Sequence, residues 1–495
     1  LGDSSRESMS LLIPSGRRLG LLNKSLLLAV SVAVSGLIIG ILAYGLLWRW
    51  RKGPASILRW LIIILLAIPP YVHALSWWIA TDFLRSILAP HGIAVPMLMG
   101  WTGSWWVQLM SLLPISVGMT LIGLESVDPA LIQSSMVMKN GFRTFMKIIL
   151  PLASPIILAS AGFVFILSLT DYSIPSLFQV TTYPLEIFAD FSSEADPSRA
   201  FLLSVPLLAI TIIVLSISQT GIRKAALSPM WRHRHALKVM PEFPDWIVSF
   251  QWLALVVLLF QFFVPLFGLS LTSGSIHGIR DSLISARSEI VFTLQTSIMA
   301  GFLCIPIAIP IAHEIARVGA RAKLWMLVAT IPLAVPASLV GIGLIHAWNR
   351  PEFSFVYGSA AMPVMASLAR FTPIAVIVIL AQLKRIDPVL IDASRVIQKN
   401  PFKSWLIVKL PILAPGFLAA LFLIFAFSAG ELGATLMVAP PGRATLTMRI
   451  YNYLHYGATE NVAGLCLIIV SLAFLGCLFA LFAIRAWSRF LPKTD

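Results

Sequence analysis

Two carboxylates are the residues whose types and spacing most suggest chemistry. Asp171 and Glu431 stand 260 residues apart, and each follows an apolar run long enough to cross a bilayer. A carboxylate at bilayer depth costs about 2.5–3.5 kcal/mol on insertion scales, so it normally faces a cavity or a partner. The two acids could flank the path of a solute, or hold a gate by accepting hydrogen bonds from loop amides. In the alternative reading they are only helix-end residues at the outer surface.

Other polar residues are not arranged for catalysis. His313 and Glu314 lack the second histidine of a zinc-peptidase helix, and the sequence has no G-x-x-x-x-G-K-[ST] loop for nucleotide phosphates. The HRH tripeptide at 233–235 lies in a basic segment that suits contact with lipid headgroups better than metal binding. No Ser, His and Asp set indicates hydrolysis. We therefore expect no enzyme activity, no metal site and no cofactor in this chain.

The composition is that of an integral membrane protein. Of the 495 residues, 58% are hydrophobic and only 12% are charged, and the mean hydropathy is +0.90. The net charge of +15 is concentrated in short segments beside apolar runs, which indicates membrane topology and not nucleic-acid binding. The three cysteines, Cys304, Cys466 and Cys477, lie inside apolar runs without the spacing of a zinc site or disulfide framework, so we interpret them as packing residues.

Apolar stretches of about 18 residues or more predict membrane-spanning helices. Eleven are predicted, at about 26–48, 57–81, 105–124, 151–172, 201–220, 246–271, 290–313, 324–347, 360–381, 411–430 and 462–485. Proline motifs inside spans, at 68–70, 305–310 and 331–336, predict kinks, with gate bending as a lesser possibility.

Positive charge sets the orientation of these spans. Six basic segments fall on one side, which is therefore the cytoplasm: 48–53, 126–151, 222–238, 316–323, 385–411 and 485–493. Eleven spans place the N-terminus outside, although the first 25 residues carry four basic side chains. Either this tail is translocated against its charge, or a first helix precedes it. No removable signal peptide is evident.

A polar cytoplasmic segment occurs twice. SVDPALIQSSMVMKNGFRTFMKIILP at 126–151 matches RIDPVLIDASRVIQKNPFKSWLIVKLP at 385–411 in eleven positions, with one gap opposite Gln398. In each copy, Asp followed by Pro predicts a helix start, because the carboxylate caps free amides and proline suits the first helical position. Asn140 with Gly141, or Asn400 with Pro401, is expected to end that helix before a second short one. We infer an internal duplication in which both repeats keep the same orientation.

The duplicated segment resembles the cytoplasmic motif of inner-membrane permeases of ATP-binding-cassette importers, which reads EAA, three residues, Gly, nine residues, I-x-L-P. In the second copy the matching positions hold Asp392, Ala393, Ser394, Gln398, Val408, Leu410 and Pro411. In the first copy they hold Gln133, Ser134, Ser135, Ile148, Leu150 and Pro151, one residue short. Neither copy has the motif glycine in place. Together with GELGATLMVAPPGRATLTMRIYNYLHYG at 430–457, the chain looks closest to the fused ferric-iron type, similar to thiamine, sulfate and molybdate permeases.

This resemblance implies an all-α polytopic protein of the bacterial inner membrane, with about eleven transmembrane helices in two tandem repeats. It implies a tail at 1–25, a first permease repeat at 26–220 with its coupling loop at 125–151, a basic cytoplasmic linker at 221–245, and a second repeat at 246–495 with its coupling loop at 384–411. The helix at 246–271 has no counterpart in the first repeat.

The resemblance also implies partners. Each motif would dock a cytoplasmic ATPase, so two ATPase copies that use ATP and Mg are expected, with a periplasmic solute-binding protein outside and the lipid bilayer around. The residues assigned to coupling are Asp128, Gln133, Ser134, Ser135, Lys139, Gly141, Pro151, Asp387, Asp392, Ala393, Ser394, Gln398, Asn400 and Pro411. Glu186 and Arg449 occupy similar places in the external loops and are candidates for docking the binding protein, or else are solvated loop charges.

The leading hypothesis is therefore an importer permease, with ferric iron as the expected cargo and alternating access as the mechanism. A self-contained secondary transporter also duplicates its fold, but that reading expects coupling-ion carboxylates near mid-span, and this chain has few. A third possibility is a membrane scaffold whose polar copies bind an adaptor. Thiamine, sulfate, molybdate or another small solute stays open as the cargo.

Overall fold

The computed structural model describes residues 11–49, 58–59, 62, 65–66, 68–138, 140–227, 242–273, 276–317, 319–384, 386, 389, 400–456 and 459–490. In the first half the longer helices are α2 (Gly16–Arg49), α4 (Pro70–Leu88), α5 (Gly100–Glu125), α6 (Pro129–Met138), α8 (Leu150–Thr170), α10 (Tyr183–Glu194) and α11 (Pro197–Leu227). In the second half they are α12 (Asp245–Thr272), α13 (Ile276–Ser285), α14 (Arg287–Ala316), α15 (Ala320–Thr330), α16 (Ala337–Trp348), α18 (Ala361–Leu383), α21 (Leu410–Ala429), α23 (Leu446–Tyr456) and α24 (Thr459–Phe490).

Short helices connect the long ones. They are η2 (Ala89–His91), α7 (Gly141–Thr144), η3 (Phe145–Ile149), α9 (Ser173–Leu177), η4 (Ile331–Ala334), η5 (Pro351–Phe353), α17 (Ser354–Tyr357), α20 (Pro401–Ser404), η6 (Trp405–Lys409) and α22 (Thr435–Val438). Every regular element in the described ranges is helical, which confirms the predicted all-α membrane fold.

Nine helices within the described residues are long and apolar enough to cross a membrane, against the eleven predicted. The first of these helices starts at residue 16, inside the predicted tail at 1–25. The predicted span at 324–347 is instead a broken pair, α15–η4 and α16, bent by 98°. Pro332 and Pro336 flank the bend, where missing N–H groups prevent a continuous helix. For the predicted span at 57–81, the described helix is α4, which starts at Pro70.

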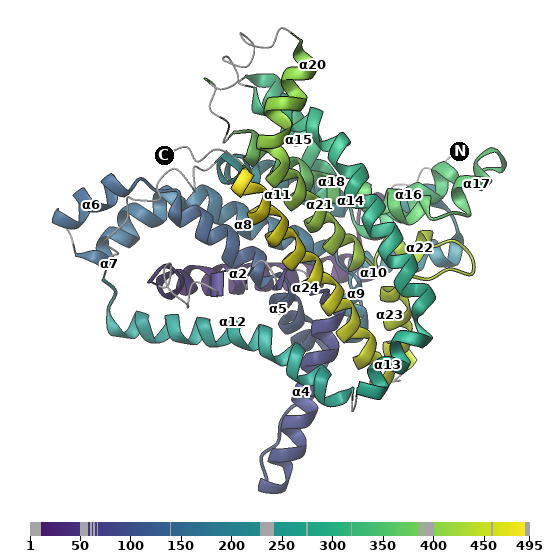
Figure 1. Ribbon diagram of the computed structural model, residues 1–495. Helices are drawn as coiled ribbons and strands as arrows, with labels where there is room; N and C mark the ends of the chain where they lie inside the picture. Colours follow the sequence, from purple (N-terminus) through teal and green to yellow (C-terminus); the bar gives the residue numbers. More distant parts are fainter. Residues whose placement is uncertain are drawn as a thin grey trace.

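Two groups of three helices form the frame, one in each half (Figure 1). In the first half α2, α5 and α8 pack on one another, and in the second half α14, α18 and α21 do the same. A fourth helix then covers each group, with α11 on α8 and α24 on α21. The repeated packing follows the repeated sequence, so the duplication extends beyond the cytoplasmic motif, although the predicted domain boundaries themselves remain a prediction.

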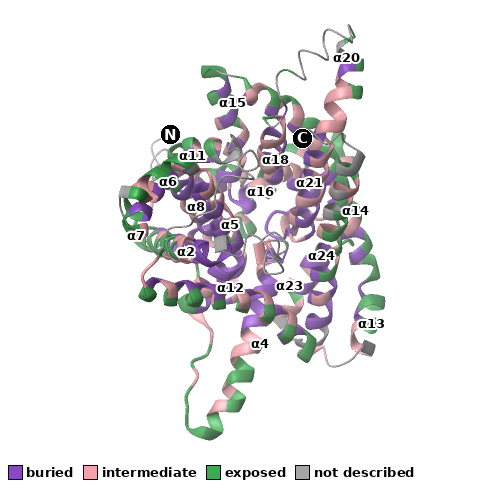
Figure 2. Cartoon of the chain, turned by 60° about the vertical axis from the view of Figure 1, so that its left-hand side comes forward, coloured by how far each residue is buried: buried purple, intermediate pink, exposed green. Residues whose placement is uncertain are grey.

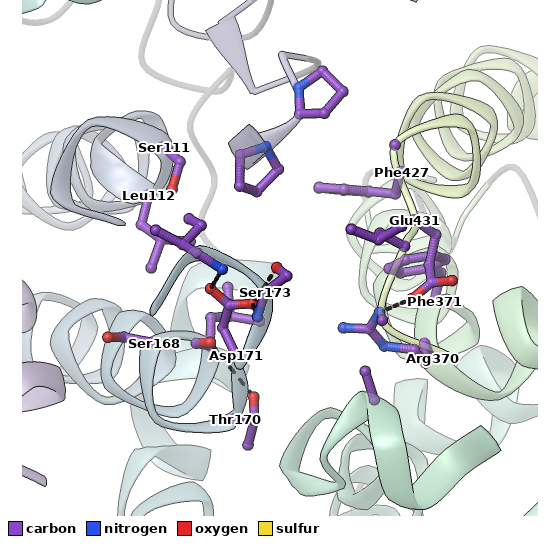
Figure 3. Close-up of a pocket in the computed structure, with 18 of the residues that line it drawn as sticks. Ser111, Leu112, Ser168, Thr170, Asp171, Ser173, Arg370, Phe371, Phe427 and Glu431 are labelled. Carbon is purple, nitrogen blue, oxygen red and sulfur yellow. Dashed lines mark hydrogen bonds and ion pairs between the residues drawn. The ribbon is translucent and has the colours of Figure 1, made fainter. Parts of the chain in front are cut away.

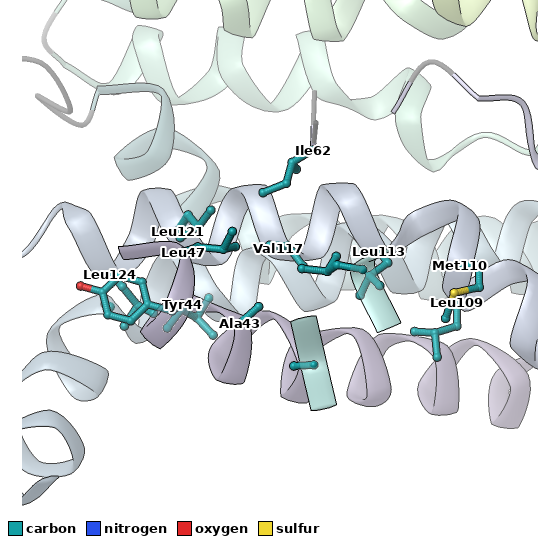
Figure 4. Packing of buried hydrophobic residues seen from close by; sticks show 14 of the residues in the cluster. Ala43, Tyr44, Leu47, Ile62, Leu109, Met110, Leu113, Val117, Leu121 and Leu124 are labelled. Carbon is teal, nitrogen blue, oxygen red and sulfur yellow. The ribbon is translucent and has the colours of Figure 1, made fainter. Parts of the chain in front are cut away.

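Small residues bring α2 against α5 in the first group. Buried apolar side chains of both helices interlock, among them Ala43, Tyr44 and Leu47 of α2 and Leu113 and Val117 of α5 (Figure 4). A Cβ atom at Gly40 would lie 3.0 Å from the Thr120 Oγ1 atom, so glycine permits this close approach. Small residues at helix interfaces are typical of membrane proteins, where packing and not water exclusion drives association.

The helix α12 joins the halves. It is the first helix of the second half in sequence, yet it packs against α2 and α4 of the first half as well as α24 of the second. Its buried Gln261 side chain donates through Nε2 to the Met110 carbonyl oxygen of α5, at 2.6 Å.

Figure 2 shows which parts of the chain are exposed and which are buried. The outer part of α4 and the segment after it extend away from the bundle and are exposed, while the helix interfaces of α5, α8, α18 and α21 are buried. The two copies of the duplicated segment, marked by α6–α7 and by α20, lie far apart in both views.

Candidate functional site

A cavity of about 190 Å³ lies where the two halves meet. Its walls come from equivalent parts of both halves: the proline motifs at 68–70 and 332–335, and the helices α5 and α8 opposite α18 and α21. Figure 3 shows the first-half residues facing the second-half residues across this space. The cavity contains both predicted pathway acids, Asp171 and Glu431.

The first-half wall is built around Asp171, which follows the last residue of α8. Its carboxylate accepts hydrogen bonds from Gln108 Nε2 at 3.2 Å, from Ser173 N at 3.0 Å and from Ser173 Oγ at 2.6 Å. It also caps α9 by accepting from Ile174 N at 3.4 Å. All of these donors are neutral groups, so dipoles solvate the negative charge, and none of the described side chains forms an ion pair with it.

The second-half wall is built around Glu431, whose side chain is 0% exposed. It forms an ion pair with Arg370 of α18. Its two oxygens also accept hydrogen bonds from Ala434 N and Thr435 N, both at 2.8 Å, and from Thr435 Oγ1. A buried carboxylate with a guanidinium partner and backbone donors has its charge satisfied. Glu431 therefore fixes the turn before α22, and Arg370, 24% exposed, is the charged group that faces the cavity.

One hydrogen bond is repeated in the two halves beneath these acids. Gln108 Oε1 accepts from Ser168 Oγ at 2.6 Å, and at the equivalent positions the hydroxyls of Ser367 and Ser428 lie 2.8 Å apart. A side-chain hydrogen bond at equivalent positions thus joins α5 to α8 and α18 to α21. It fixes the helix ends from which Asp171 and Glu431 project, so the two acids are equivalent in position but not in charge environment.

The halves are also joined beside the cavity. The Tyr172 hydroxyl donates to the Gly433 carbonyl oxygen at 2.8 Å, and the hydroxyls of Ser176 and Tyr451 lie 3.2 Å apart. Burial, then the charge of Glu431, raises the pKa of Tyr172, so its hydroxyl keeps its proton at neutral pH. A Cβ atom at Gly433 would lie 2.6 Å from the Ala337 Cβ, which shows how closely the elements meet here.

Glu186 and Arg449, the predicted docking charges, are both engaged within the chain. Glu186 pairs with Arg17 at the start of α2 at 2.9 Å, and Arg449 pairs with Glu289 at the start of α14 at 2.6 Å. The two pairs occupy equivalent positions, but the charges are exchanged. In the first pair the acid lies on α10 and the base on α2, whereas in the second pair the base lies on α23 and the acid on α14. Burial alone would lower the pKa of Arg449, but its bonds to Glu289 and Tyr453 raise it overall. A docking role for either residue stays a prediction.

A matching hydroxyl contact holds α10 and α23 beside their ion pairs. Ser25 Oγ of α2 accepts from Tyr183 N of α10 at 2.8 Å. Thr293 Oγ1 of α14 accepts from Leu446 N of α23, also at 2.8 Å. The amphipathic helices α10 and α23 are therefore held at the same place in each half.

The first copy of the duplicated segment (126–151), called here the first coupling copy, has the predicted helix–turn–helix form. Asp128 caps α6 by accepting from Ala130 N at 2.8 Å. The helix α6 ends at Met138, just before the predicted Asn140–Gly141 stop, and Asn140 also begins α7, because its side chain accepts from Arg143 N at 3.0 Å. Gln133 and Ser134 are exposed, Ser135 is half-buried, and the Val137 residue is 89% exposed. Lys139 lies outside the described residues.

Aromatic packing supports this copy from beneath. The Phe145 ring packs at 5.1 Å from the Phe243 ring and at 6.4 Å from the Tyr44 ring, measured between centroids. The Phe142 ring lies 6.3 Å from the ring of Trp246 in α12. The first coupling copy is therefore attached both to α2 of its own half and to α12 of the second half.

The second copy is described at residues 386 and 389 and from residue 400 onward. Asp387, Asp392, Ala393, Ser394 and Gln398 lie outside the described residues. Asn400 again caps a short helix, accepting from Lys403 N at 3.3 Å.

Both copies enter the next span through a π-helical turn, which the sequence did not predict. Leu150 N donates to Phe145 O, and Leu410 N donates to Trp405 O, in each case five residues back. Pro151 or Pro411 follows directly, so the predicted exit prolines lie at the same structural position in both copies. Gly141 is the first residue of α7.

Sequence reasoning missed two cavity residues, Arg370 and Gln108. The available signal for Arg370 was a single cation inside the predicted span at 360–381, since an ionisable residue in a span usually faces a polar site. Among the described residues, no three His, Cys, Asp or Glu side chains come together as metal ligands.

Comparison with known proteins shows which chains this one is similar to. An Fe(3+)-transport system permease protein of Haemophilus influenzae is 22% identical over 449 residues, which cover 88% of this chain and 84% of the relative. A molybdenum transport system permease protein of the same organism is 28% identical over 209 residues, 39% of this chain but 91% of the relative. A Salmonella typhimurium protein that carries the name of a 2-aminoethylphosphonate transport system permease is 24% identical over 192 residues, covering 39% of this chain and 72% of the relative.

No family model matches the chain. The relatives confirm the resemblance to importer permeases, the ferric type included. Together with the apolar helices, they make the chain a multi-pass protein of the bacterial inner membrane that works in transport. The molybdenum relative is matched over nearly its whole length by two fifths of this chain, as a duplicated permease would require.

Proposed function

We propose that this chain is the membrane permease of an ATP-driven importer that passes ferric iron from a periplasmic binding protein to the cytoplasm by alternating access. The cavity between the two halves is the observation that carries the proposal, because a path bounded by both repeats opens or closes when they move relative to each other. Two ATPase subunits, which use ATP and Mg, would bind the coupling copies on the opposite side.

The charge of the cavity supports a cationic cargo. Its lining contains two carboxylates, Asp171 and Glu431, and one guanidinium, Arg370, so its formal charge is −1. The name of the relative that matches most of the chain supports iron in particular. A bare oxyanion such as molybdate would meet the uncompensated charge of Asp171 at short range in a low dielectric, where repulsion is strong. We therefore favour iron over molybdate or sulfate.

The positions of the coupling copies support ATPase docking. The first copy presents an exposed face that includes Gln133, Ser134 and the apolar Val137, and an exposed apolar side chain of this kind suits a partner surface. Closure of two ATPases would push both copies, and the aromatic contacts of Phe142 and Phe145 would carry the movement to α12 and α2.

Reconstitution of uptake tests the proposal. The chain is placed in proteoliposomes with the ATPase and binding protein encoded beside it, and entry of radiolabelled ferric iron is followed with and without ATP. We expect uptake only with ATP, and a strong loss in Asp171→Asn. Asp82→Asn is the matched control, because that side chain is 64% exposed and outside the cavity. Uptake that needs no nucleotide would instead establish the secondary transporter.

A second variant tests the coupling role separately. Gln133→Arg places a bulky cation on the exposed face of α6 and should reduce uptake while leaving the ATPase active. Asp392→Arg should act in the same way in the second copy. Unchanged transport in both variants would remove the support for ATPase docking at these segments.

Transport of 2-aminoethylphosphonate is a second candidate. It is favoured by one observation: the cavity presents the guanidinium of Arg370 opposite the carboxylate of Asp171 (Figure 3). A zwitterion has an anionic group that suits Arg370 and a cationic group that suits Asp171.

A further inference from the structure

We infer that the cavity takes a cargo in which a positive centre is joined to a phosphate-like oxyanion, with the positive centre at Asp171 and the oxyanion at Arg370. This inference rests on the proposed function, because it assumes that the cavity is the transport path. It adds that Arg370, a residue outside the predicted site, determines specificity by binding the anionic part of the cargo.

The first-half wall is rich in acceptors for a positive centre. Two hydroxyls beside Asp171 line the cavity, and both give their hydrogen to Gln108: Ser168 Oγ donates to its side chain at 2.6 Å and Ser111 Oγ to its carbonyl oxygen at 3.0 Å. Each hydroxyl therefore has only lone pairs left to present. With the carboxylate of Asp171, they make this wall attractive to a cation and unattractive to an anion.

The second-half wall offers donors instead. A guanidinium has five N–H groups in a planar fork and no acceptor, and Arg370 directs its NH1 group to Glu431. Glu431 accepts from three further donors at residues 434–435 and its side chain is fully buried, so its carboxylate is satisfied within the wall. The cavity-facing part of Arg370 is thus suited to oxygens of an oxyanion, for which such forks are well matched.

The surroundings strengthen both interactions. Apolar side chains also line both walls, with Leu112 on the first-half side and Phe371 and Phe427 on the second-half side (Figure 3). A low dielectric increases the attraction between each wall and its opposite charge, and it penalises a cargo that brings only one charge. A cavity of about 190 Å³ is also below the roughly 300–1,000 Å³ of sites for drug-sized ligands, so the cargo is small.

Two sources can supply this chemistry. One is a ferric ion that travels with a bound phosphate-type anion, and the other is a zwitterion such as 2-aminoethylphosphonate. Both present a cationic centre and an oxyanion in one small unit, and the experiment below separates them.

Calorimetric binding to the full chain in lipid nanodiscs, without ATPase or nucleotide, tests the inference. The probes are 2-aminoethylphosphonate, its single-charge analogues ethylphosphonate and ethylammonium, and inorganic phosphate with and without ferric ion. If the zwitterion is the source, 2-aminoethylphosphonate binds about tenfold or more tighter than either analogue. If iron is the source, phosphate binds only when ferric ion is present. Equal binding of single-charge and double-charge probes, or no binding of any probe, would overturn the inference.

Variants assign the two walls. Arg370→Met should remove the advantage of the double-charge probe over ethylammonium, and Asp171→Asn should remove its advantage over ethylphosphonate. Because Arg370→Met leaves Glu431 buried without its partner, the double variant Arg370→Met with Glu431→Gln provides a neutral replacement of the pair. Arg85→Met, outside the cavity, is the control and should bind like the original chain. If the double variant kept the preference, Arg370 would be a purely structural partner of Glu431.

The binding experiment separates this inference from the proposed function. If iron uptake requires ATP but no double-charge preference is found, the inference alone fails. If the preference is found but uptake needs no nucleotide, the importer proposal fails and the dipolar site remains.

Discussion

At the scale of single residues, close helix contacts depend on glycine. A Cβ atom at Gly221 of α11 would lie 1.8 Å from the Pro155 carbonyl oxygen and 2.4 Å from the Ala159 Cβ of α8. Backbone oxygen cannot move aside as a flexible side chain can, so α8 and α11 would have to separate.

We therefore predict that Gly221→Ala destabilises the protein, by about 1–3 kcal/mol as for other overpacked sites. Gly343→Ala in α16 is the matched control, because nothing lies within 4 Å of the added Cβ. The measurement is the Tm of the detergent-purified chain, and equal Tm values for the two variants would contradict the packing argument.

The Arg17–Glu186 and Arg449–Glu289 ion pairs should also differ in strength. Arg17 is 72% exposed, and exposed pairs contribute about 0–1 kcal/mol, so Glu186→Gln should have little effect. Arg449 and Glu289 are only 19% and 17% exposed, so Arg449→Gln leaves a partly buried carboxylate unpaired. Hydrogen exchange should therefore become faster in α23 of Arg449→Gln than in α10 of Glu186→Gln. Equal changes would show that burial does not distinguish the pairs.

Residue chemistry could be predicted where it follows from local rules. The Asp-Pro start of α6 was predicted from the sequence, and so was the equivalence of Asp171 and Glu431 at aligned positions of the two repeats. The stop of α6 before Asn140 followed the sequence, but the role of Asn140 as the cap of α7 was not predicted, because only the geometry shows which amide its side chain accepts from. The Arg370–Glu431 pair was missed because its partners are 61 residues apart and nothing local links them.

At the scale of elements, proline explains the π turns before α8 and α21. A proline at 151 has no N–H and its ring would clash with the carbonyl of residue 147 in a regular helix. The bond from Leu150 N back to Phe145 O widens the turn and removes this conflict, and the second copy does the same with Trp405.

Replacing Pro151 and Pro411 by Ala should restore α-helical turns and rotate each coupling copy relative to its span by about 100°, the angle of one residue. We expect ATP-dependent uptake to fall severalfold while binding of the purified ATPase is kept. Pro310→Ala is the control, because this exposed proline lies inside α14, away from either coupling copy. Full uptake in the double variant would mean that the π turns have no role in coupling.

Spans were predicted well where hydropathy alone decides, and less well where proline does. Nine of the predicted spans correspond to continuous helices in the described part of the chain. The span at 324–347 failed because averaging over a window hides Pro332 and Pro336, whose effect is on the backbone and not on hydropathy. The same prolines bring residues 332–335 to the cavity wall, so the error fell at the site itself.

At the scale of the whole molecule, the predicted orientation places the α6–α7 segment on the cytoplasmic side of the membrane and α17 on the outer side. In Figure 1 the α6–α7 and α20 segments lie away from α16 and α17. Val137→Cys in α6 (89% exposed in the original chain) should react with an impermeant maleimide only from the cytoplasmic side, and Phe355→Cys in α17 (74% exposed) only from outside. Both are made after the three native cysteines are replaced by alanine. Labelling of Val137→Cys from outside would reverse the orientation on which the coupling role depends.

The placement of α12 has a consequence for how such a protein can be made. Because this helix follows the linker in sequence but lies against α2 and α4, scission of the polypeptide between the halves would not free them from each other. Two separately translated fragments should still assemble into one complex, because α12 of the second packs against α2 and α4 of the first. Fusion of the halves into a single gene product therefore secures equal numbers of each, while the contacts of α12 secure their attachment.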